Sequence, residues 1–151
     1  MRSVKFVLLS LACAGALLAA DPFVGTWKLN SAKTKYKTGT PPKEQMLTYT
    51  EEGGELHVMA KGTSSDGKTV TNHFTVPTSG GTAKIIESPY DGISVKNTSA
   101  NQRETSFSKA GKVVYTAKSK LSADGKTMTI AVKGNNSFGQ SVDGSNVYEK
   151  Q

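Results

Sequence analysis

The chain has 151 residues, which is enough for one domain and too few for two of ordinary size. Its formal net charge is +7, and this charge comes mainly from lysines that alternate with threonines and serines. After residue 20 it holds a single arginine, Arg103, whereas proteins that read nucleic acids favour arginine for bidentate contacts to bases. We therefore expect a solvated outer face and no nucleic-acid partner.

The first 20 residues differ from the rest of the chain. Arg2 and Lys5 precede an uncharged run of apolar and small residues that ends at Asp21-Pro22. A charged start, a short apolar core and a small-residue exit are typical of a secretory signal peptide, so we predict cleavage near Ala20. Acylation of Cys13 as a lipoprotein is the alternative.

The apolar run is shorter than the ~20 residues that a membrane span needs, and no second run follows it. The sequence thus predicts a signal peptide over 1–20 and one domain over 21–151, with no membrane span. We expect the mature protein to be periplasmic or extracellular. Loss of Cys13 with the signal would leave no cysteine, so the domain would depend on its apolar core rather than on disulfides.

From residue 21 onward the apolar residues alternate with period two, which favours β-strands over helices. Turn signals separate the strands at intervals typical of an all-β barrel or sandwich. These signals are Glu52-Gly53-Gly54, Asp66-Gly67, Ser79-Gly80-Gly81, Asp91-Gly92, Ala110-Gly111, Asp124-Gly125 and Asp143-Gly144. The ten predicted strands cover residues 23–29, 44–51, 55–62, 68–76, 82–88, 92–98, 101–108, 112–121, 126–134 and 145–149. We expect an antiparallel up-and-down β-barrel of about eight to ten strands, with a two-sheet β-sandwich as the alternative.

The hairpin around Asp124-Gly125 can be predicted in detail. Any loop of even length there places an apolar set of side chains on one face and a Lys/Thr set on the other. The apolar set is Val113, Tyr115, Ala117, Ser119, Leu121, Met128, Ile130 and Val132. This division predicts a sheet that is packed on one face and wet on the other.

The two ends of residues 21–151 resemble the calycin barrels, which include lipocalins and intracellular fatty-acid-binding proteins. The opening segment is Phe23-Val24-Gly25-Thr26-Trp27-Lys28-Leu29, and the closing segment is Val147-Tyr148-Glu149-Lys150. These segments, with 111–114 and 124–127, are also similar to a group of small exported bacterial proteins often labelled lipocalin-like. The resemblance implies a barrel fold and an exported location, and it implies no reaction.

The chain departs from the fatty-acid-binding proteins at one position that matters for ligand binding. Those proteins carry an Arg-x-Tyr pair on the last strand that holds a carboxylate, and here the corresponding residues are Asn146-Val147-Tyr148. Tyr148 is kept and the cation is missing. A lid of two helices is also not expected, because residues 30–43 are short and contain Pro41 and Pro42.

No motif for catalysis or metal binding stands out. Serines are plentiful, but none lies in a Gly-x-Ser-x-Gly motif. A two-residue loop at Asp66-Gly67 would place His73 opposite Ala60 and His57 opposite Val76, on opposite faces of the sheet. We therefore expect no metal site, no cofactor and no enzymatic activity.

Arg103 is the most informative single residue. A three-residue loop at Lys109-Ala110-Gly111 would place Phe107 opposite Val113 and Arg103 opposite Ala117, both inside the barrel, whereas a two-residue loop would expose them. We favour the first arrangement because it buries Phe107. A buried arginine then needs a carboxylate of the protein or a ligand anion as its partner.

The sequence therefore predicts a non-enzymatic exported barrel that binds a small apolar or amphiphilic molecule. Arg103 would hold the polar end of this ligand, and Phe74, Tyr115, Met128, Ile130 and Tyr148 would line the remainder. The alternative is a secreted protein–protein interaction module, such as an enzyme inhibitor or an envelope adhesin, that uses the Lys/Thr face. A third possibility is a hydrolase with an unrecognised site. A filled interior favours the module, and a cavity of roughly a few hundred Å³ favours the binder.

Overall fold

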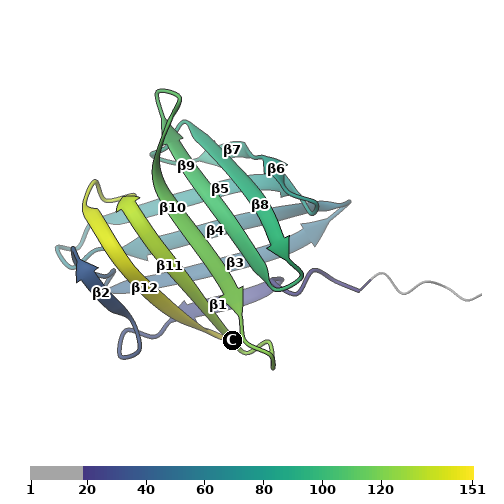
Figure 1. The fold of residues 1–151 in the computed structure, drawn as a ribbon, viewed down its shortest axis with the longest axis horizontal. Helices are drawn as coiled ribbons and strands as arrows, with labels where there is room; N and C mark the ends of the chain where they lie inside the picture. Colours follow the sequence, from purple (N-terminus) through teal and green to yellow (C-terminus); the bar gives the residue numbers. More distant parts are fainter. Residues whose placement is uncertain (1–18) are drawn as a thin grey trace, which may run out of the picture.

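The computed structural model describes residues 19–151, so the predicted signal peptide lies outside the described residues except for Ala19 and Ala20. Twelve β-strands form one antiparallel sheet that coils into a barrel (Figure 1). Residues 19–151 contain no helix in their assigned secondary structure. In particular, no helix among the described residues is long and apolar enough to cross a membrane.

The strands follow one another in chain order with short connections. They are β1 (Gly25–Leu29), β2 (Lys35–Thr38), β3 (Glu44–Glu52), β4 (Glu55–Thr63), β5 (Thr69–Pro77), β6 (Gly81–Thr82), β7 (Lys84–Glu87), β8 (Gly92–Ser99), β9 (Gln102–Lys109), β10 (Lys112–Leu121), β11 (Thr127–Asn135) and β12 (Ser141–Lys150). The order across the sheet is β6-β8-β9-β10-β11-β12-β1-β3-β4-β5-β7, and β2 also pairs with β12.

The barrel is nearly closed. Strand β1 joins its first and last parts because it pairs with both β12 and β3. At the other side, β7 lies beside β8 without forming a ladder with it, and the amide of Ala83 donates to the carbonyl of Ile93 across this seam at 2.9 Å. Closure protects most strand edges, which would otherwise offer unpaired backbone groups to other chains.

The strand count of eight to ten was too low, for two reasons. The segment over 30–43 was predicted as a plain connection, but part of it forms β2 against β12. The predicted strand over 82–88 is divided at Ala83 into β6 and β7, which pair with β8 and β5 respectively. The chain adopts the barrel and not the two-sheet sandwich.

The last predicted turn was also wrong. Asp143-Gly144 lies inside β12, and the turn before this strand is formed by residues 136–140. Gly144 allows the ring of Tyr36 to lie directly against the backbone of β12, because a Cβ atom at 144 would come within 2.3 Å of Tyr36 Cδ1. A glycine in this strand thus marks a close approach rather than a turn.

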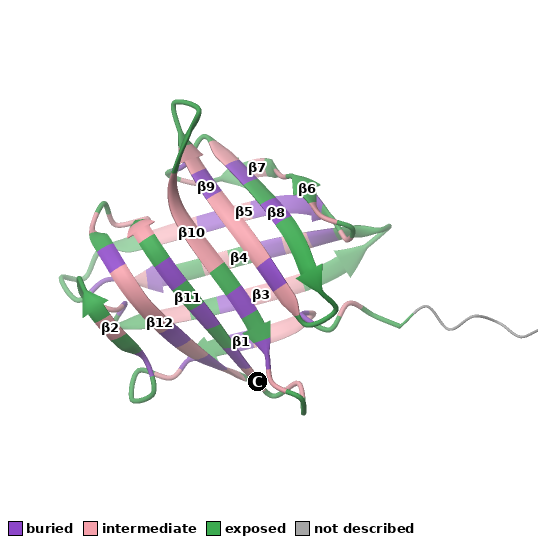
Figure 2. Cartoon of the chain, viewed as in Figure 1, coloured by how far each residue is buried: buried purple, intermediate pink, exposed green. Residues whose placement is uncertain are grey.

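The hairpin of β10 and β11 agrees with its prediction from Tyr115 to Val132, whereas Val113, which was predicted to face inward, is exposed. Leu121 lies opposite Met128, Ser119 opposite Ile130 and Ala117 opposite Val132. Along β11 the buried residues alternate with exposed ones, as Figure 2 shows for the strands at the front of the barrel. The apolar face therefore lines the interior and the Lys/Thr face is in solvent.

The loop between β9 and β10 has two residues and not the three that were predicted. Ala110 and Gly111 both have left-handed backbone conformations, with φ values of 50° and 76°, and Lys109 pairs with Lys112. A β-bulge between Val113 and Tyr115 then shifts the register. As a result Phe107 and Arg103 still face inward, opposite Tyr115 and Ser119, while Val113 is 58% exposed.

The predicted register of the two histidines was wrong as well. The β4–β5 hairpin pairs Thr63 with Thr69, so His73 lies opposite Met59 and His57 opposite Thr75. Both imidazoles therefore lie on the outer face of the sheet rather than on opposite faces. Within residues 19–151, no group of three or more His, Cys, Asp or Glu side chains is arranged to hold a metal ion.

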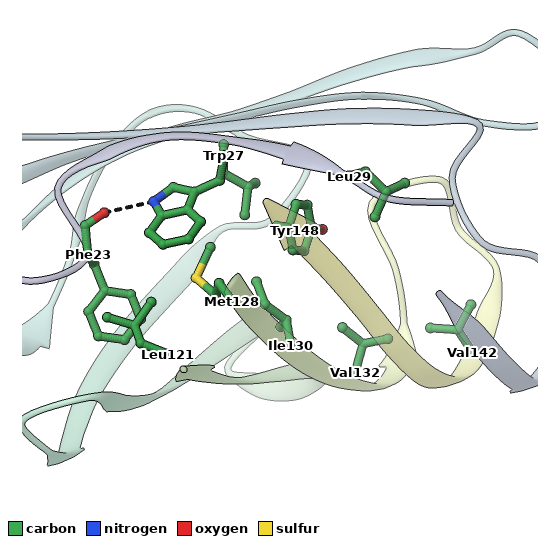
Figure 3. Packing of buried hydrophobic residues seen from close by; sticks show 10 residues of the cluster. Phe23, Trp27, Leu29, Leu121, Met128, Ile130, Val132, Val142 and Tyr148 are labelled. Atoms are coloured by element: carbon green, nitrogen blue, oxygen red, sulfur yellow. Dashed lines mark hydrogen bonds between the residues drawn. The ribbon is translucent and has the colours of Figure 1, made fainter. Parts of the chain in front are cut away.

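One end of the barrel is closed by packed side chains. Phe23, Trp27 and Met128 are fully buried, and Leu121 and Tyr148 pack beside them. The indole Nε1 of Trp27 donates to the carbonyl of Phe23 at 2.9 Å (Figure 3). A second cluster, built around Leu56, Phe74, Val76, Tyr90 and Phe107, continues the core on the opposite wall.

Candidate ligand cavity

The barrel encloses a cavity next to these two clusters. The space that water-sized atoms can occupy is about 90 Å³. A larger figure of about 840 Å³ counts all empty space in the cavity, the gaps between side chains and the open mouth. The smaller volume limits what can bind, because the larger one includes open solvent. A site for one water needs about 10–15 Å³ of such space. The cavity can therefore hold several waters or one small molecule.

The wall of the cavity is aromatic and aliphatic, with a few amides and hydroxyls. The rings are Tyr36, Tyr49, Phe74, Phe107, Tyr115, Phe138 and Tyr148, and the main aliphatic side chains are Leu47, Val58, Val70, Ile130 and Val132. The polar side chains are Gln45, Asn72, Thr105, Ser119, Asn136, Ser137 and Asn146. A predominantly apolar wall with few polar groups is typical of small-molecule sites.

Among the described residues, 19–151, none of those that line the cavity is Asp, Glu, Lys, Arg or His. The only titratable groups on the wall are phenols, and all of them stay neutral at physiological pH. Desolvation by burial raises the pKa of Tyr49 to about 12, and it raises the pKa of Tyr115 and Tyr148 as well. The cavity is thus an uncharged environment.

Polar groups meet where β12, β2 and β3 approach one another. The phenol of Tyr148 donates to Oε1 of Gln45 at 2.6 Å. Asn146, on the same strand, is only 3% exposed, and its Oδ1 has no hydrogen-bond partner. The Asn146 side chain lies within hydrogen-bonding reach of the phenols of Tyr36 and Tyr148. This contact lowers the pKa of each phenol and so opposes part of the increase that burial causes. This places an amide and two phenols together at the cavity wall.

A second set of hydrogen-bonded polar side chains lies on the side of the cavity near the seam between β7 and β8. Nδ2 of Asn72 donates to Oγ of Ser137 at 2.8 Å, and Oγ of Ser88 donates to Oδ1 of Asn72 at 2.6 Å. The phenol of Tyr90 donates to the carbonyl of Asn135 at 2.9 Å. These bonds tie the segment between β7 and β8 to the turn between β11 and β12.

Arg103 lies at the closed end of the barrel and faces a carboxylate of the protein. Its Nη2 forms an ion pair with Asp21, its Nε donates to Oδ1 of Asn97 at 3.0 Å, and its guanidinium lies 4.2 Å from the ring centroid of Phe23. Both members of the ion pair are more than nine-tenths buried. The N-terminal segment thus closes this end through an ion pair and a cation–π contact.

The structure brings four of the six predicted ligand-binding residues to the cavity wall: Phe74, Tyr115, Ile130 and Tyr148. Met128 is not among the lining residues, because it is fully buried in the cluster with Trp27. Arg103 is not among them either, since it faces Asp21. The head-group role predicted for Arg103 therefore has no support in this geometry.

Several lining residues escaped sequence reasoning. Tyr36 was missed because its strand was taken as part of a connection, and Phe138 was missed because it lies in a turn. The signal that could have found Tyr36 is Gly144, a glycine in an otherwise regular strand. Asn146 was noted only for the cation that it replaces, although a buried amide is itself a polar group that needs partners.

No known protein family matches the chain, and no curated protein is significantly similar to it. Among solved structures, a de novo designed fluorescence-activating β-barrel is similar, with 14% identity over 88% of this chain and 97% of the designed one, and a TM-score of 0.47. The calycin and lipocalin resemblance stays an expectation from the sequence. The described chain is an antiparallel, nearly closed β-barrel of twelve strands with a small uncharged cavity.

Proposed function

We propose that this chain is an exported, non-enzymatic barrel that binds one small apolar or amphiphilic molecule in its interior. The observation that carries the proposal is the cavity itself: an aromatic wall with few polar groups, inside a barrel whose other end is closed by packing. An interior selected only for stability would be filled at the density of an organic crystal. Unfilled space costs stability, and ligand binding is a function that offsets this cost.

The cavity volume limits the size of the ligand. About 90 Å³ is below the roughly few hundred Å³ that favour a binder, so that criterion is not met. The volume is nearer to an engineered cavity of about 150 Å³ that accepts benzene. The ligand is accordingly about the size of one ring, and any larger tail extends into the open mouth. The cavity is too small to enclose a long-chain ligand, so the proposal does not extend to a carrier of long chains.

The test blocks the cavity and uses a matched control on the other face of the sheet. Ala117 lines the cavity, and Ala131 lies on the neighbouring strand with its side chain in solvent. Binding of fluorobenzene is measured by ¹⁹F NMR. We expect the native chain and Ala131→Phe to bind it and Ala117→Phe to lose it, because the added ring occupies the cavity.

Near-ultraviolet circular dichroism controls for the fold, since overpacking can cost about 1–3 kcal/mol. Failure of the native chain to bind, or equal binding by a folded Ala117→Phe variant, would contradict the proposal. In that case the Lys/Thr outer face would become the surface to study.

Export is part of the proposal and rests on the sequence of residues 1–20. Ala19 and Ala20 are exposed, whereas Asp21 is held by Arg103. N-terminal sequencing of the mature protein should find Asp21 first. Recovery of a chain acylated at Cys13 would instead indicate a membrane anchor.

A further inference from the structure

The peptide bond before Asp21 joins the predicted signal peptide to the folded barrel, and this inference rests on the export proposed above. We infer that Glu51 is the binding site for the α-ammonium group that cleavage before Asp21 creates, so that processing adds an ion pair to the closed end of the barrel. Three observations carry this inference: the fold holds Asp21 in place, Glu51 already accepts from its amide, and the charges around the two residues lack one cation.

Asp21 is the first residue that the fold holds in place. Its carboxylate pairs with Arg103 and accepts from the amide of Phe23 at 2.9 Å, and its carbonyl oxygen accepts from the amide of Val24 at 3.0 Å. Residues 19–20, by contrast, are exposed and lie outside any strand. Removal of the residues before Asp21 therefore leaves these contacts in place, and the new terminus stays where the amide nitrogen now lies.

The carboxylate of Glu51 already contacts the nitrogen that cleavage would free. The amide of Asp21 donates to Oε2 of Glu51 at 2.9 Å. Glu51 lies two residues after Tyr49 on β3, so both side chains start from the same face of the strand, and Glu51 is exposed at the closed end.

Cleavage changes the charge of this nitrogen. Hydrolysis of the Ala20–Asp21 bond consumes one water: its hydroxyl forms the carboxyl group of Ala20, and its hydrogen makes the Asp21 nitrogen a primary amine. An α-amino group has a pKa near 8, so this amine takes up a second proton and is mainly an ammonium at pH 6.5. A neutral donor is thereby replaced by a cation beside a carboxylate, and hydrogen bonds between ionised groups are about twice as strong as neutral ones.

The charges around this nitrogen lack one cation in the unprocessed chain. Two carboxylates, those of Asp21 and Glu51, meet there, and Arg103 pairs with Asp21. Within residues 19–151, Glu51 takes part in no ion pair. The α-ammonium supplies the second cation. Exposed ion pairs are usually weak because two mobile side chains must be ordered, but here the terminus is already fixed and only the Glu51 side chain loses freedom.

The segment that starts at Asp21 plugs the closed end of the barrel. Phe23 is fully buried, its carbonyl accepts from the indole of Trp27, and its ring lies under Arg103. An ion pair at Asp21 fastens the outer end of this plug. Cleavage one residue earlier, after Ala19, would move the ammonium by up to ~3.8 Å and leave only an amide beside Glu51. The position of the cut should therefore matter for stability.

The experiment compares two chains of equal charge, one that begins at Asp21 and one that begins at Ala20. Each is released from a fusion partner by a protease that leaves no extra residue, and both are unfolded with urea at pH 6.5 and low salt. We expect the unfolding equilibrium constant of the Asp21 chain to be about three- to fivefold smaller, which is the upper part of the range for exposed pairs. In 1 M NaCl the difference should fall below about 1.5-fold, because the salt screens the pair.

Two variants assign the effect to one carboxylate. Glu51→Gln keeps the shape of the side chain and removes its charge, so the two chains should then differ by less than about 1.5-fold. Glu52→Gln is the matched control, since this exposed neighbour alternates to the other face of β3. It removes the same charge and should leave the three- to fivefold difference unchanged.

The outcomes separate this inference from the proposed export. Equal stability of the two native chains, or a difference that persists in Glu51→Gln, would show that Glu51 does not bind the terminus. Because both chains have defined ends, this result does not depend on how the protein is processed in its host. N-terminal sequencing of the exported protein tests the processing separately, and a start other than Asp21 would overturn that part.

Discussion

At the scale of single residues, the ion pair of Arg103 and Asp21 links the start of the described chain to β9. Asp21 also receives a hydrogen bond on Oδ1 from the amide of Phe23 at 2.9 Å, and its own amide donates to Glu51 at 2.9 Å. Arg103 keeps one nitrogen, Nη1, buried without a partner. A buried pair of this kind gives little net stability, but removal of one partner leaves an uncompensated charge.

Replacing Arg103 with Met should therefore destabilise the fold by about 3–5 kcal/mol, because it leaves the Asp21 carboxylate buried and unpaired. The double variant Arg103→Met/Asp21→Asn should lose less than the sum of the two single variants, by about 0.5–3 kcal/mol. Urea denaturation of the four proteins measures this coupling.

Toluene affinity should be unchanged in the folded fraction of Arg103→Met, because Arg103 does not line the cavity. If the variant kept its stability and lost its ligand, Arg103 would belong to the binding site, as the sequence alone had predicted. If the two substitutions were additive, the ion pair would contribute nothing specific.

At the scale of strands, the sequence predicted most of the sheet but not its irregularities. Alternation and glycine turns located nearly every strand within a few residues, and the β10–β11 register followed from one turn. The β-bulge near Val113 could not be predicted, because a bulge changes which face a side chain occupies without changing the alternation on either side of it. The inward position of Phe107 was correct because the short loop and the bulge offset each other.

The bulge depends on Gly134, which lies opposite Tyr115. Gly134 has φ near 109°, and a Cβ atom there would lie 2.2 Å from the carbonyl oxygen of Val114. Gly134→Ala should therefore destabilise the barrel by more than the ~1–2 kcal/mol of a left-handed alanine alone, since backbone atoms must also move. Thermal unfolding followed by circular dichroism measures the loss.

Gly53→Ala is the matched control for this substitution. Gly53 also has a left-handed φ, 59°, but a Cβ atom there would meet nothing within 4 Å. We expect Gly53→Ala to lower stability only by the ~1–2 kcal/mol that a left-handed alanine costs. Equal losses for the two variants would show that the close approach at the bulge does not constrain the fold.

At the scale of the whole molecule, the cavity wall was predictable only in part. Phe74, Tyr115, Ile130 and Tyr148 follow from inward-facing positions on strands. Tyr36 and Phe138 come from segments whose structure depends on contacts with β12 and on a turn, and local sequence patterns do not encode such contacts. The partner of Arg103 was likewise missed, because Asp21 is 82 residues away in the sequence.

Two interior tyrosines, the partly buried Tyr49 and the buried Tyr90, make stability depend on alkaline pH. Desolvation raises the pKa of Tyr49 and Tyr90 to about 12, whereas the unfolded value is near 10. The contribution of these two phenols to the free energy of unfolding is complete below pH 10. It is lost as pH rises from 10 toward 12, because in this window the phenols ionise in the unfolded chain and stay neutral in the folded one. Each should lower the free energy of unfolding by about 1.4 kcal/mol per pH unit.

The variant Tyr49→Phe tests this dependence. It should make the alkaline slope of stability shallower by about 1.4 kcal/mol per pH unit and leave the stability at pH 7 little changed, because it removes one titrating group and keeps the ring. Urea denaturation between pH 9 and 12 gives the slopes. An unchanged slope would mean that the Tyr49 hydroxyl is in contact with solvent.

The most direct measurement of the central claim is a crystal structure of the mature chain grown with phenol. We predict electron density for one ring inside the barrel, between Ile130 and Phe74. A barrel whose interior is filled by its own side chains, with phenol found only on the outer surface, would contradict the claim.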